Sequence, residues 1–314
     1  MFQNAKHKIF FVIALGFSSQ FLHATNIPES MAALGDSITA AALSSYTRTD
    51  GMNPFILPQF LFMATQYGMT QSFTAFESRQ YSWATGLDGK VTSHAIRLNQ
   101  LAQAEGFQLQ ILNAAISGAK ASDIPGEVAS VLQWSQDNLS DGAPDYVTLE
   151  IGPNDLCAKT NADMTPVADF GNTIHDSLEK LLVASNKTHI LITGIPNVQH
   201  LQEIAANSSL GLPPLSKCQD MWNVVNYCNN ILQDTNAADE AIVKQRLEDY
   251  MHEFETMTED FNNKYGADRV RFAHQLYDYN FSDMQISIDC FHPNKPGHQA
   301  LSDVTWAQTW WANK

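Results

Sequence analysis

The sequence predicts an α/β fold in which a parallel central sheet is covered by helices on both faces. Short apolar runs alternate along the chain with longer segments of helical apolar spacing, which is typical of strands joined by crossover helices. The composition is that of a folded protein, because 44% of the residues are hydrophobic and 16% are charged. With 314 residues, the chain is long enough to bury a sizeable core.

Five apolar runs are the expected strands. They are residues 31–40, 107–119, 145–155, 188–196 and 269–273. The first, "MAALGDSITA", ends in a turn, and the fourth, "THILITGIP", is continuously apolar, as in a buried strand. Ligands bind beyond the carboxyl ends of parallel strands, so residues that follow these runs are candidates for a site.

Four segments with helical spacing are residues 124–139, 167–185, 238–265 and 296–312. Two further segments, residues 53–89 and 197–234, fit the alternation poorly. We expect them to be insertions near one end of the sheet, either binding loops or plain surface packing. No internal repeat or linker divides the chain, so residues 25–314 are expected to form a single domain.

The N-terminus has the order of a secretory signal peptide. Lys6 and Lys8 precede an apolar run over residues 9–17, and small residues then lead to Ala24. The run is too short to span a membrane, which takes about 20 residues. We therefore expect residues 1–24 to be cleaved off after Ala24 and the mature protein to be secreted or periplasmic, with no stable membrane span.

Charge and motifs exclude several classes of partner. Loss of residues 1–24 would leave 16 basic and 33 acidic residues, a net charge of −17. So acidic a surface repels nucleic acid and anionic membranes at long range, and we expect no nucleic-acid partner. The sequence has no HExxH motif, P-loop or GxGxxG after its first strand, so we expect no metal and no cofactor.

The chain contains four cysteines, Cys157, Cys218, Cys228 and Cys290, and none has the spacing of a zinc site. An even number in an exported protein suggests disulfides, although four free buried thiols are the alternative. Three pairings are possible. Cys218 and Cys228 are close in sequence, which favours a local bridge between them and leaves Cys157 to pair with Cys290.

Ser37, in "LGDSITA", is either a nucleophile or a small residue in a turn. A serine becomes nucleophilic when a histidine accepts its proton and a carboxylate holds that histidine in place. "DCFHPN" offers Asp289 and His292, whose spacing lets the carboxylate reach one ring nitrogen while the other faces outward. His298, at the start of the last helix, is the alternative base.

Acyl transfer also needs hydrogen-bond donors for an oxyanion. "SGA" offers the backbone N–H of Gly118, and "IGPND" offers Gly152 and the side-chain amide of Asn154. Each signal is weak alone, because glycine after a strand usually reflects turn geometry. Asp36 is expected to be a turn residue, since a sequence neighbour of a nucleophile rarely points at the same site.

Taken in order, these residues resemble the SGNH, or GDSL, family of serine hydrolases. "GDSITA", "NAAISGA", "IGPND" and "DCFHPN" are similar to the first, second, third and fifth blocks of that family and span residues 35–294. The resemblance implies a flavodoxin-like three-layer α/β/α sandwich. It also implies a triad of Ser37, Asp289 and His292, with an oxyanion hole made by the N–H groups of Ser37 and Gly118 and the amide of Asn154.

"YSWATGLDG" and "LNAAISGAKASDIP" look like the phospholipase B-like branch, which implies a lipid acyl ester as substrate. Residues 54–67 are then expected either to line an acyl groove or to form a core helix. An acetyl esterase acting on a glycan is the second possibility, for which Trp83, Trp134 and Trp222 would suit sugars. An exported binding domain without turnover is the third. The sequence does not predict the oligomeric state.

Overall fold

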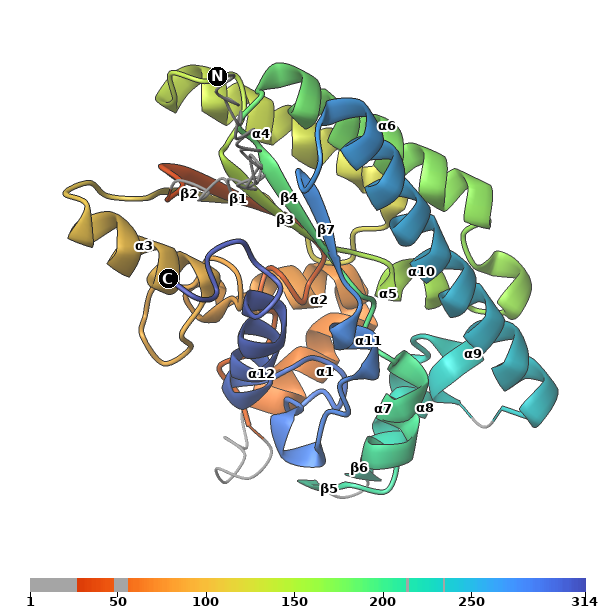
Figure 1. The fold of residues 1–314 in the computed structure, drawn as a ribbon. Coiled ribbons are helices and arrows are strands. Elements are labelled where there is room, and N and C mark those ends of the chain that lie inside the picture. Colours follow the sequence, from red (N-terminus) through yellow and green to blue (C-terminus); the bar gives the residue numbers. More distant parts are fainter. Residues whose placement is uncertain (1–26, 48–55, 213–214, 234) are drawn as a thin grey trace, which may run out of the picture.

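Five parallel strands form the central sheet of the computed structural model, which describes residues 27–47, 56–212, 215–233 and 235–314. The strands are β1 (Ser30–Gly35), β2 (Gln110–Asn113), β3 (Tyr146–Glu150), β4 (His189–Thr193) and β7 (Val270–Ala273). Their order across the sheet is β2-β1-β3-β4-β7 (Figure 1). This order is the flavodoxin-like arrangement, so the predicted fold class is confirmed.

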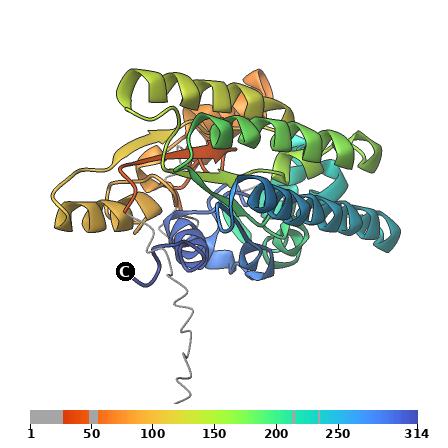
Figure 2. The same ribbon diagram turned by 45° about the horizontal axis from the view of Figure 1, so that its top comes forward.

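Helices cover both faces of the sheet, as Figure 2 shows. One face carries α4 (Ile124–Asn138), α6 (Val167–Ala184) and α10 (Ala237–Tyr265). The other carries α3 (His94–Ala104) and α12 (Lys295–Trp306). The helical spacing therefore predicted four of these five helices, while α3 was not predicted.

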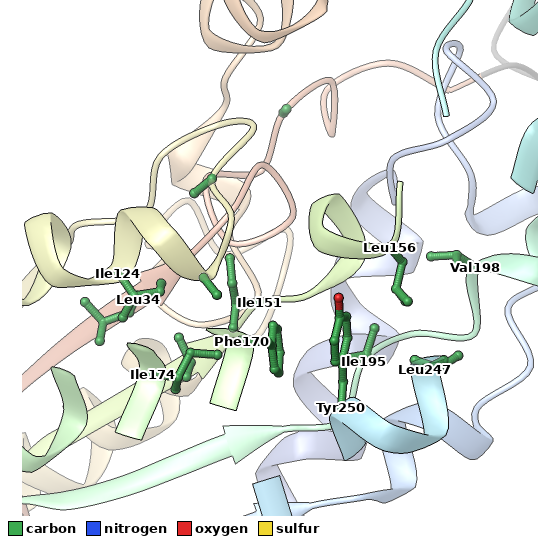
Figure 3. Packing of buried hydrophobic residues seen from close by; sticks show 14 of the residues in the cluster. Leu34, Ile124, Ile151, Leu156, Phe170, Ile174, Ile195, Val198, Leu247 and Tyr250 are labelled. Atoms are coloured by element: carbon green, nitrogen blue, oxygen red, sulfur yellow. The ribbon is translucent and has the colours of Figure 1, made fainter. Parts of the chain in front are cut away.

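The strand residues alternate between the two layers of core, because successive side chains in a strand point to opposite faces. Leu34 lies in the larger cluster with Ile174 of α6 (Figure 3). Met31 and Leu191 lie in the smaller cluster with Leu98 of α3. The inner strands β1, β3 and β4 are almost entirely buried, which explains why they read as continuous apolar runs in the sequence.

The two segments expected to be insertions contain short helices beyond the carboxyl ends of the strands. The first contains α1 (Ile56–Tyr67), α2 (Met69–Ala75) and the 3₁₀ turn Arg79–Tyr81. The second contains α7 (Val198–Ala205), the hairpin β5 (Ser209–Leu212) and β6 (Leu215–Lys217), α8 (Cys218–Val225) and α9 (Asn229–Leu232). The remaining short elements are α5 (Pro153–Leu156), α11 (Gln275–Asp278) and the 3₁₀ turns Ala121–Asp123, Asn161–Asp163 and Asp283–Gln285.

The preferred disulfide pairing was wrong. The bonds join Cys157 to Cys228 and Cys218 to Cys290, so all four cysteines are paired. Cys218 begins α8 and Cys228 follows it, and a helix of that length alone spans roughly 10 Å. That exceeds the Cα separation of about 7 Å that a disulfide tolerates. Closeness in sequence therefore did not predict the pairing, because most of the residues between Cys218 and Cys228 are helical.

The last helix also ends earlier than expected, at Trp306 rather than residue 312. The Thr309 backbone N–H and hydroxyl both donate to the Trp306 carbonyl, at 2.9 Å and 2.8 Å, which turns the chain. The turn places Trp311 against Tyr146 in the smaller core cluster. Within the described residues, no helix is long and apolar enough to cross a membrane. The predicted signal peptide, residues 1–24, lies outside the described residues.

Candidate active site

Ser37 lies in a tight turn directly after β1. The turn begins at Gly35, whose φ is +139° and where a Cβ atom would lie 2.1 Å from the Glu150 carbonyl oxygen of the neighbouring strand. Only glycine fits so close to another backbone. Asp36 Oδ1 accepts a hydrogen bond from the Ile38 N–H at 2.8 Å, which closes the turn. Ser37 is thereby fixed at the carboxyl end of a central strand.

The loop that carries His292 is closed by its own backbone. The Ser287 N–H donates to the His292 carbonyl at 2.8 Å, and the Asn294 N–H donates to the Gln285 carbonyl at 2.9 Å. Asn294 then caps α12, because its side chain accepts from the Gly297 N–H. The Ser287 hydroxyl donates to the Leu43 carbonyl at 2.7 Å, which ties this loop to the turn after β1.

Ser37, His292 and Asp289 form one hydrogen-bonded chain. His292 Nε2 lies 2.7 Å from Ser37 Oγ, and His292 Nδ1 lies 2.5 Å from Asp289 Oδ2. Asp289 Oδ1 also accepts from the His292 backbone N–H at 3.1 Å. The Nδ1–H group of the imidazole donates a hydrogen bond to the carboxylate. Nε2 therefore carries no proton and accepts a hydrogen bond from the serine hydroxyl. This is the arrangement that activates a serine.

Aromatic rings enclose the imidazole. Phe73 of α2 packs edge-on against His292 with ring centroids 4.4 Å apart, and Phe291 does the same at 5.0 Å. The His292 side chain is fully buried in the free protein. Low local polarity strengthens its bonds to Ser37 and Asp289.

His298, the alternative base, does not take part in this chain. It is fully buried in α12, and burial, with a smaller effect of the nearby His292, lowers its pKa to about 3. A ring that stays neutral and buried in this way serves the packing of α12. Among the described residues, His292 is the histidine whose ring nitrogen contacts Ser37 Oγ.

Gly118 and Asn154 lie beyond the ends of β2 and β3. Gly118 has a φ of +84°, and a Cβ atom there would lie 2.8 Å from Thr70 Oγ1 of α2. Asp155 links the two loops, because its Oδ2 accepts from the Ala121 N–H at 3.0 Å. Backbone N–H groups and an asparagine amide gathered at one edge can serve as donors to an oxyanion.

The Asn154 amide is held by three hydrogen bonds. Its Nδ2 donates to Asp36 Oδ2 at 3.1 Å and to the Ala119 carbonyl at 3.0 Å. Its Oδ1 accepts from the Tyr227 hydroxyl at 2.9 Å. Asp36 is therefore more than the expected turn residue, since one carboxylate oxygen closes the turn while the other contacts the asparagine.

A group of buried acids lies behind the turn. Glu127 of α4 accepts from the Gly35 N–H at 2.8 Å, and burial raises its pKa to about 8. Burial likewise raises the pKa of Asp36 to about 6 and, with the adjacent Asp36, keeps the pKa of Glu150 well above its usual range. Protons shared among these carboxyls near neutral pH avoid the cost of several buried charges.

Sequence reasoning missed the contribution of the second insertion. Tyr227 contacts Asn154, and the two disulfides join residues 218–228 to the loops that carry Asn154 and His292. Residues 54–67, expected either to line an acyl groove or to form a core helix, are largely α1, which buries Leu57 and Phe60 in the core. No pattern in the polar stretch around Tyr227 pointed to the site.

Comparisons with known proteins give matches to solved structures at low sequence identity and a match to one family model. Among solved structures, the psychrotrophic esterase EstA from Pseudoalteromonas sp. is 15% identical, with 89% of this chain and 96% of that chain covered and a TM-score of 0.45. An extracellular lipase from Streptomyces rimosus is 13% identical, with 89% and 99% covered and a TM-score of 0.43.

The acetyl xylan esterase Axe2 from Geobacillus stearothermophilus is 14% identical, with 91% and 96% covered and a TM-score of 0.45. Among curated proteins, none matches this chain. The family model for GDSL-like lipases and acylhydrolases matches residues 31–304, which include every residue of the hydrogen-bonded chain. The protein therefore belongs to the GDSL-like lipase/acylhydrolase family and is a carboxylic ester hydrolase of the GDSL type.

Proposed function

We propose that the protein cleaves acyl esters of lipids, of the lysophospholipid or phospholipid type, through an acyl-enzyme on Ser37. His292 Nε2 takes the Ser37 proton as Oγ bonds to the ester carbonyl carbon. The N–H groups of Ser37 and Gly118 and the Asn154 amide stabilise the oxyanion. His292 protonates the leaving alcohol oxygen as the ester C–O bond breaks, and Asp289 holds the ring in the required tautomer.

Deacylation repeats these steps with water. A water molecule loses a proton to His292 Nε2 and adds to the acyl carbon. The acyl–Oγ bond then breaks, Oγ recovers the proton, and the fatty acid leaves. The reaction needs no group other than those of the chain and water, and its charges balance at each step.

A mainly apolar groove, lined in part by sequence neighbours of the site residues, is the observation that supports a lipid substrate. Its lining includes Ile38, Pro153, Phe291 and Pro293, which are sequence neighbours of Ser37, Asn154 and His292. The rest of the lining is Val198, His200, Leu201 and Ile204 of α7, with Pro196, Asn197, Phe281 and Ile286, so Asn197 and His200 are its two polar side chains. Apolar walls gain free energy by removing an acyl chain from water, and they offer few partners to sugar hydroxyls.

The tryptophans expected to suit a glycan give that alternative no support. Trp83 and Trp222 are buried in the core, at 0% and 2% exposure, so neither offers a face for stacking on a sugar. Trp134, on α4, is half-buried and is not among the residues that line the groove. We therefore prefer a lipid acyl ester to an acetylated glycan as the substrate.

Export is part of the proposal. The basic, apolar and small-residue order of residues 1–24 is that of a signal peptide, and both disulfides favour an oxidising compartment. Separation of the medium, the periplasm and the cytoplasm of cells that express the full chain, followed by mass spectrometry of the protein in each, tests this. An N-terminus at residue 25 in the secreted or periplasmic fraction is expected.

A chain-length series tests the substrate class. We expect Ile204→Trp, which narrows the groove, to lower kcat/KM for an octanoyl ester at least tenfold while changing that for an acetyl ester less than twofold. Val183→Trp is the matched control, because Val183 is 69% exposed on α6 and lines no part of the groove. Fatty acid release from lysophosphatidylcholine is expected for the wild type.

Two results of that series would count against a lipid substrate. Hydrolysis of acetyl esters alone, with Ile204→Trp as active as the wild type, would move the substrate to acetylated glycans. Binding of esters without any turnover would leave only a binding role.

A further inference from the structure

Tyr227 comes from the second insertion and reaches the proposed oxyanion hole. It lies between α8 and α9, and its hydroxyl donates to Asn154 Oδ1 at 2.9 Å. Burial, with Asp36 and Asp289 nearby, raises the pKa of this hydroxyl, so it remains a protonated donor at any pH of use. The contact joins two segments that are 73 residues apart in the sequence.

The position of Tyr227 is fixed from several sides. The next residue, Cys228, is bonded to Cys157, only three residues after Asn154. Cys228 also has a left-handed φ of 54°, which turns the chain sharply beside the tyrosine. The Tyr227 ring packs edge-on against Phe73 and Phe291, the two rings that enclose His292, with centroids 5.6 Å and 5.5 Å away.

The hydrogen bonds of Asn154 show what this contact does. Both amide hydrogens already have acceptors in the free protein, Asp36 Oδ2 and the Ala119 carbonyl. An amide NH₂ has two hydrogens, so an oxyanion must share or replace one of these acceptors. The Tyr227 bond is made to the other end of the amide and can persist through that exchange. Donation to an amide oxygen also polarises the N–H groups and makes them better donors.

We propose that Tyr227 is a positioning residue, held by the Cys157–Cys228 disulfide, that keeps the Asn154 amide oriented and polarised while it binds the oxyanion. The inference rests on the proposed function, since it assigns Asn154 to the oxyanion hole. It gives the second insertion a role in the chemistry as well as in the groove.

The test is a double-mutant cycle. Tyr227→Phe keeps the ring and removes the donor, and we expect it to lower kcat about three- to tenfold with KM changed less than twofold. Tyr265→Phe is the matched control, because the Tyr265 hydroxyl bonds Glu179 at 2.8 Å on the α6–α10 face. It should leave kcat unchanged. Thermal unfolding of both variants checks that the fold is intact.

The second arm of the cycle uses Asn154→Ala. Loss of one oxyanion donor costs about 10²- to 10³-fold in kcat, which leaves a measurable rate. If Tyr227 acts through Asn154, adding Tyr227→Phe to Asn154→Ala produces no further loss. A kcat within twofold of wild type in Tyr227→Phe, or the same loss in both backgrounds, would overturn the inference and leave the proposed function standing. Full activity of Asn154→Ala would instead remove Asn154 from the oxyanion hole, and the inference with it.

Discussion

Ser37 and His292 lie 255 residues apart in the sequence, yet His292 Nε2 is 2.7 Å from Ser37 Oγ. Two loops meet here. The turn after β1 carries the serine, and the closed loop before α12 carries the histidine. The Ser287 hydroxyl, which donates to the Leu43 carbonyl, locks the two loops together. The geometry of the site is therefore a property of the whole fold.

Asp289 is expected to act through the histidine tautomer. Asp289→Asn would preserve the volume and the backbone contacts but would present an amide to His292 Nδ1. The ring would then hold its proton on the wrong nitrogen, and kcat should fall about 10⁴-fold with little change in KM. Steady-state kinetics on a soluble ester measure this. Activity within tenfold of wild type would exclude Asp289 as the orienting acid.

Gly118→Ala is expected to impair turnover because it would move the Gly118 N–H and strain the backbone at that residue. Its φ of +84° disfavours a side chain, and the new Cβ would meet Thr70 Oγ1 at 2.8 Å. We expect kcat to fall at least about tenfold as the Gly118 N–H moves. Thr70→Ala in the same chain removes the two closest atoms and should restore part of the rate.

Gly106→Ala is the control for strain alone, because Gly106 has a φ of +91° and open space around its Cβ position. It should lower the free energy of unfolding by about 1 kcal/mol without changing kcat. Equal kcat losses in the two variants would show that the Gly118 position has no particular part in catalysis.

Glu127 is expected to make the protein less stable as the pH rises. Its pKa is 4.5 in the unfolded chain and about 8 when folded, so between these values the folded state holds a proton that the unfolded state releases. The free energy of unfolding should therefore decrease across that range, by up to about 1.4 kcal/mol per pH unit.

Glu127→Gln tests this, since the amide oxygen can still accept from the Gly35 N–H. Urea unfolding at several pH values should show that the free energy of unfolding decreases less steeply with pH in the variant than in the wild type. The slope should not vanish, because burial also raises the pKa of Asp36 and of Asp155. Parallel curves for variant and wild type would contradict the expectation.

The Cys218–Cys290 disulfide is expected to stabilise the fold, because it closes a loop of 72 residues next to the loop that carries His292. Replacing both cysteines by alanine should lower the free energy of unfolding by about 2–5 kcal/mol. Alanine is preferred to serine because serine would bury a hydroxyl at each position. Denaturant unfolding of the variant against the oxidised wild type measures this. A loss of less than about 1 kcal/mol in the free energy of unfolding would mean that noncovalent contacts alone hold α8 against the loop that carries His292.

Much of this fold could be predicted from the sequence, and the reason is visible in β3 and β4. Strands buried on both faces leave an apolar run that is hard to mistake, and α6 and α10 have a clear helical period. The Ser37, Gly118, Asn154 and Asp289–His292 motifs were also found, because their order along the chain resembles one family although each is weak alone. The structure brings Ser37, Asp289 and His292 into one chain, while their chemical roles remain a proposal.

The rest depended on contacts that have no local pattern. The Asp36 carboxylate was read as a turn group, and only the packing of β1 beside β3 brings its second oxygen to Asn154. The position of Tyr227 depends on which cysteines pair. The helix between Cys218 and Cys228 keeps these two apart, so each pairs with a more distant cysteine. Nonlocal geometry of this kind cannot be inferred from spacing.

The most direct test of the account is the release of fatty acid from lysophosphatidylcholine by the wild type and by Ser37→Ala, with both proteins shown to be folded. Because Ser37 is proposed to carry the acyl group, we expect the wild type to turn over this lipid and the variant to be slower by about 10⁴-fold or more. Equal turnover by both proteins would contradict the assignment of Ser37 as the nucleophile.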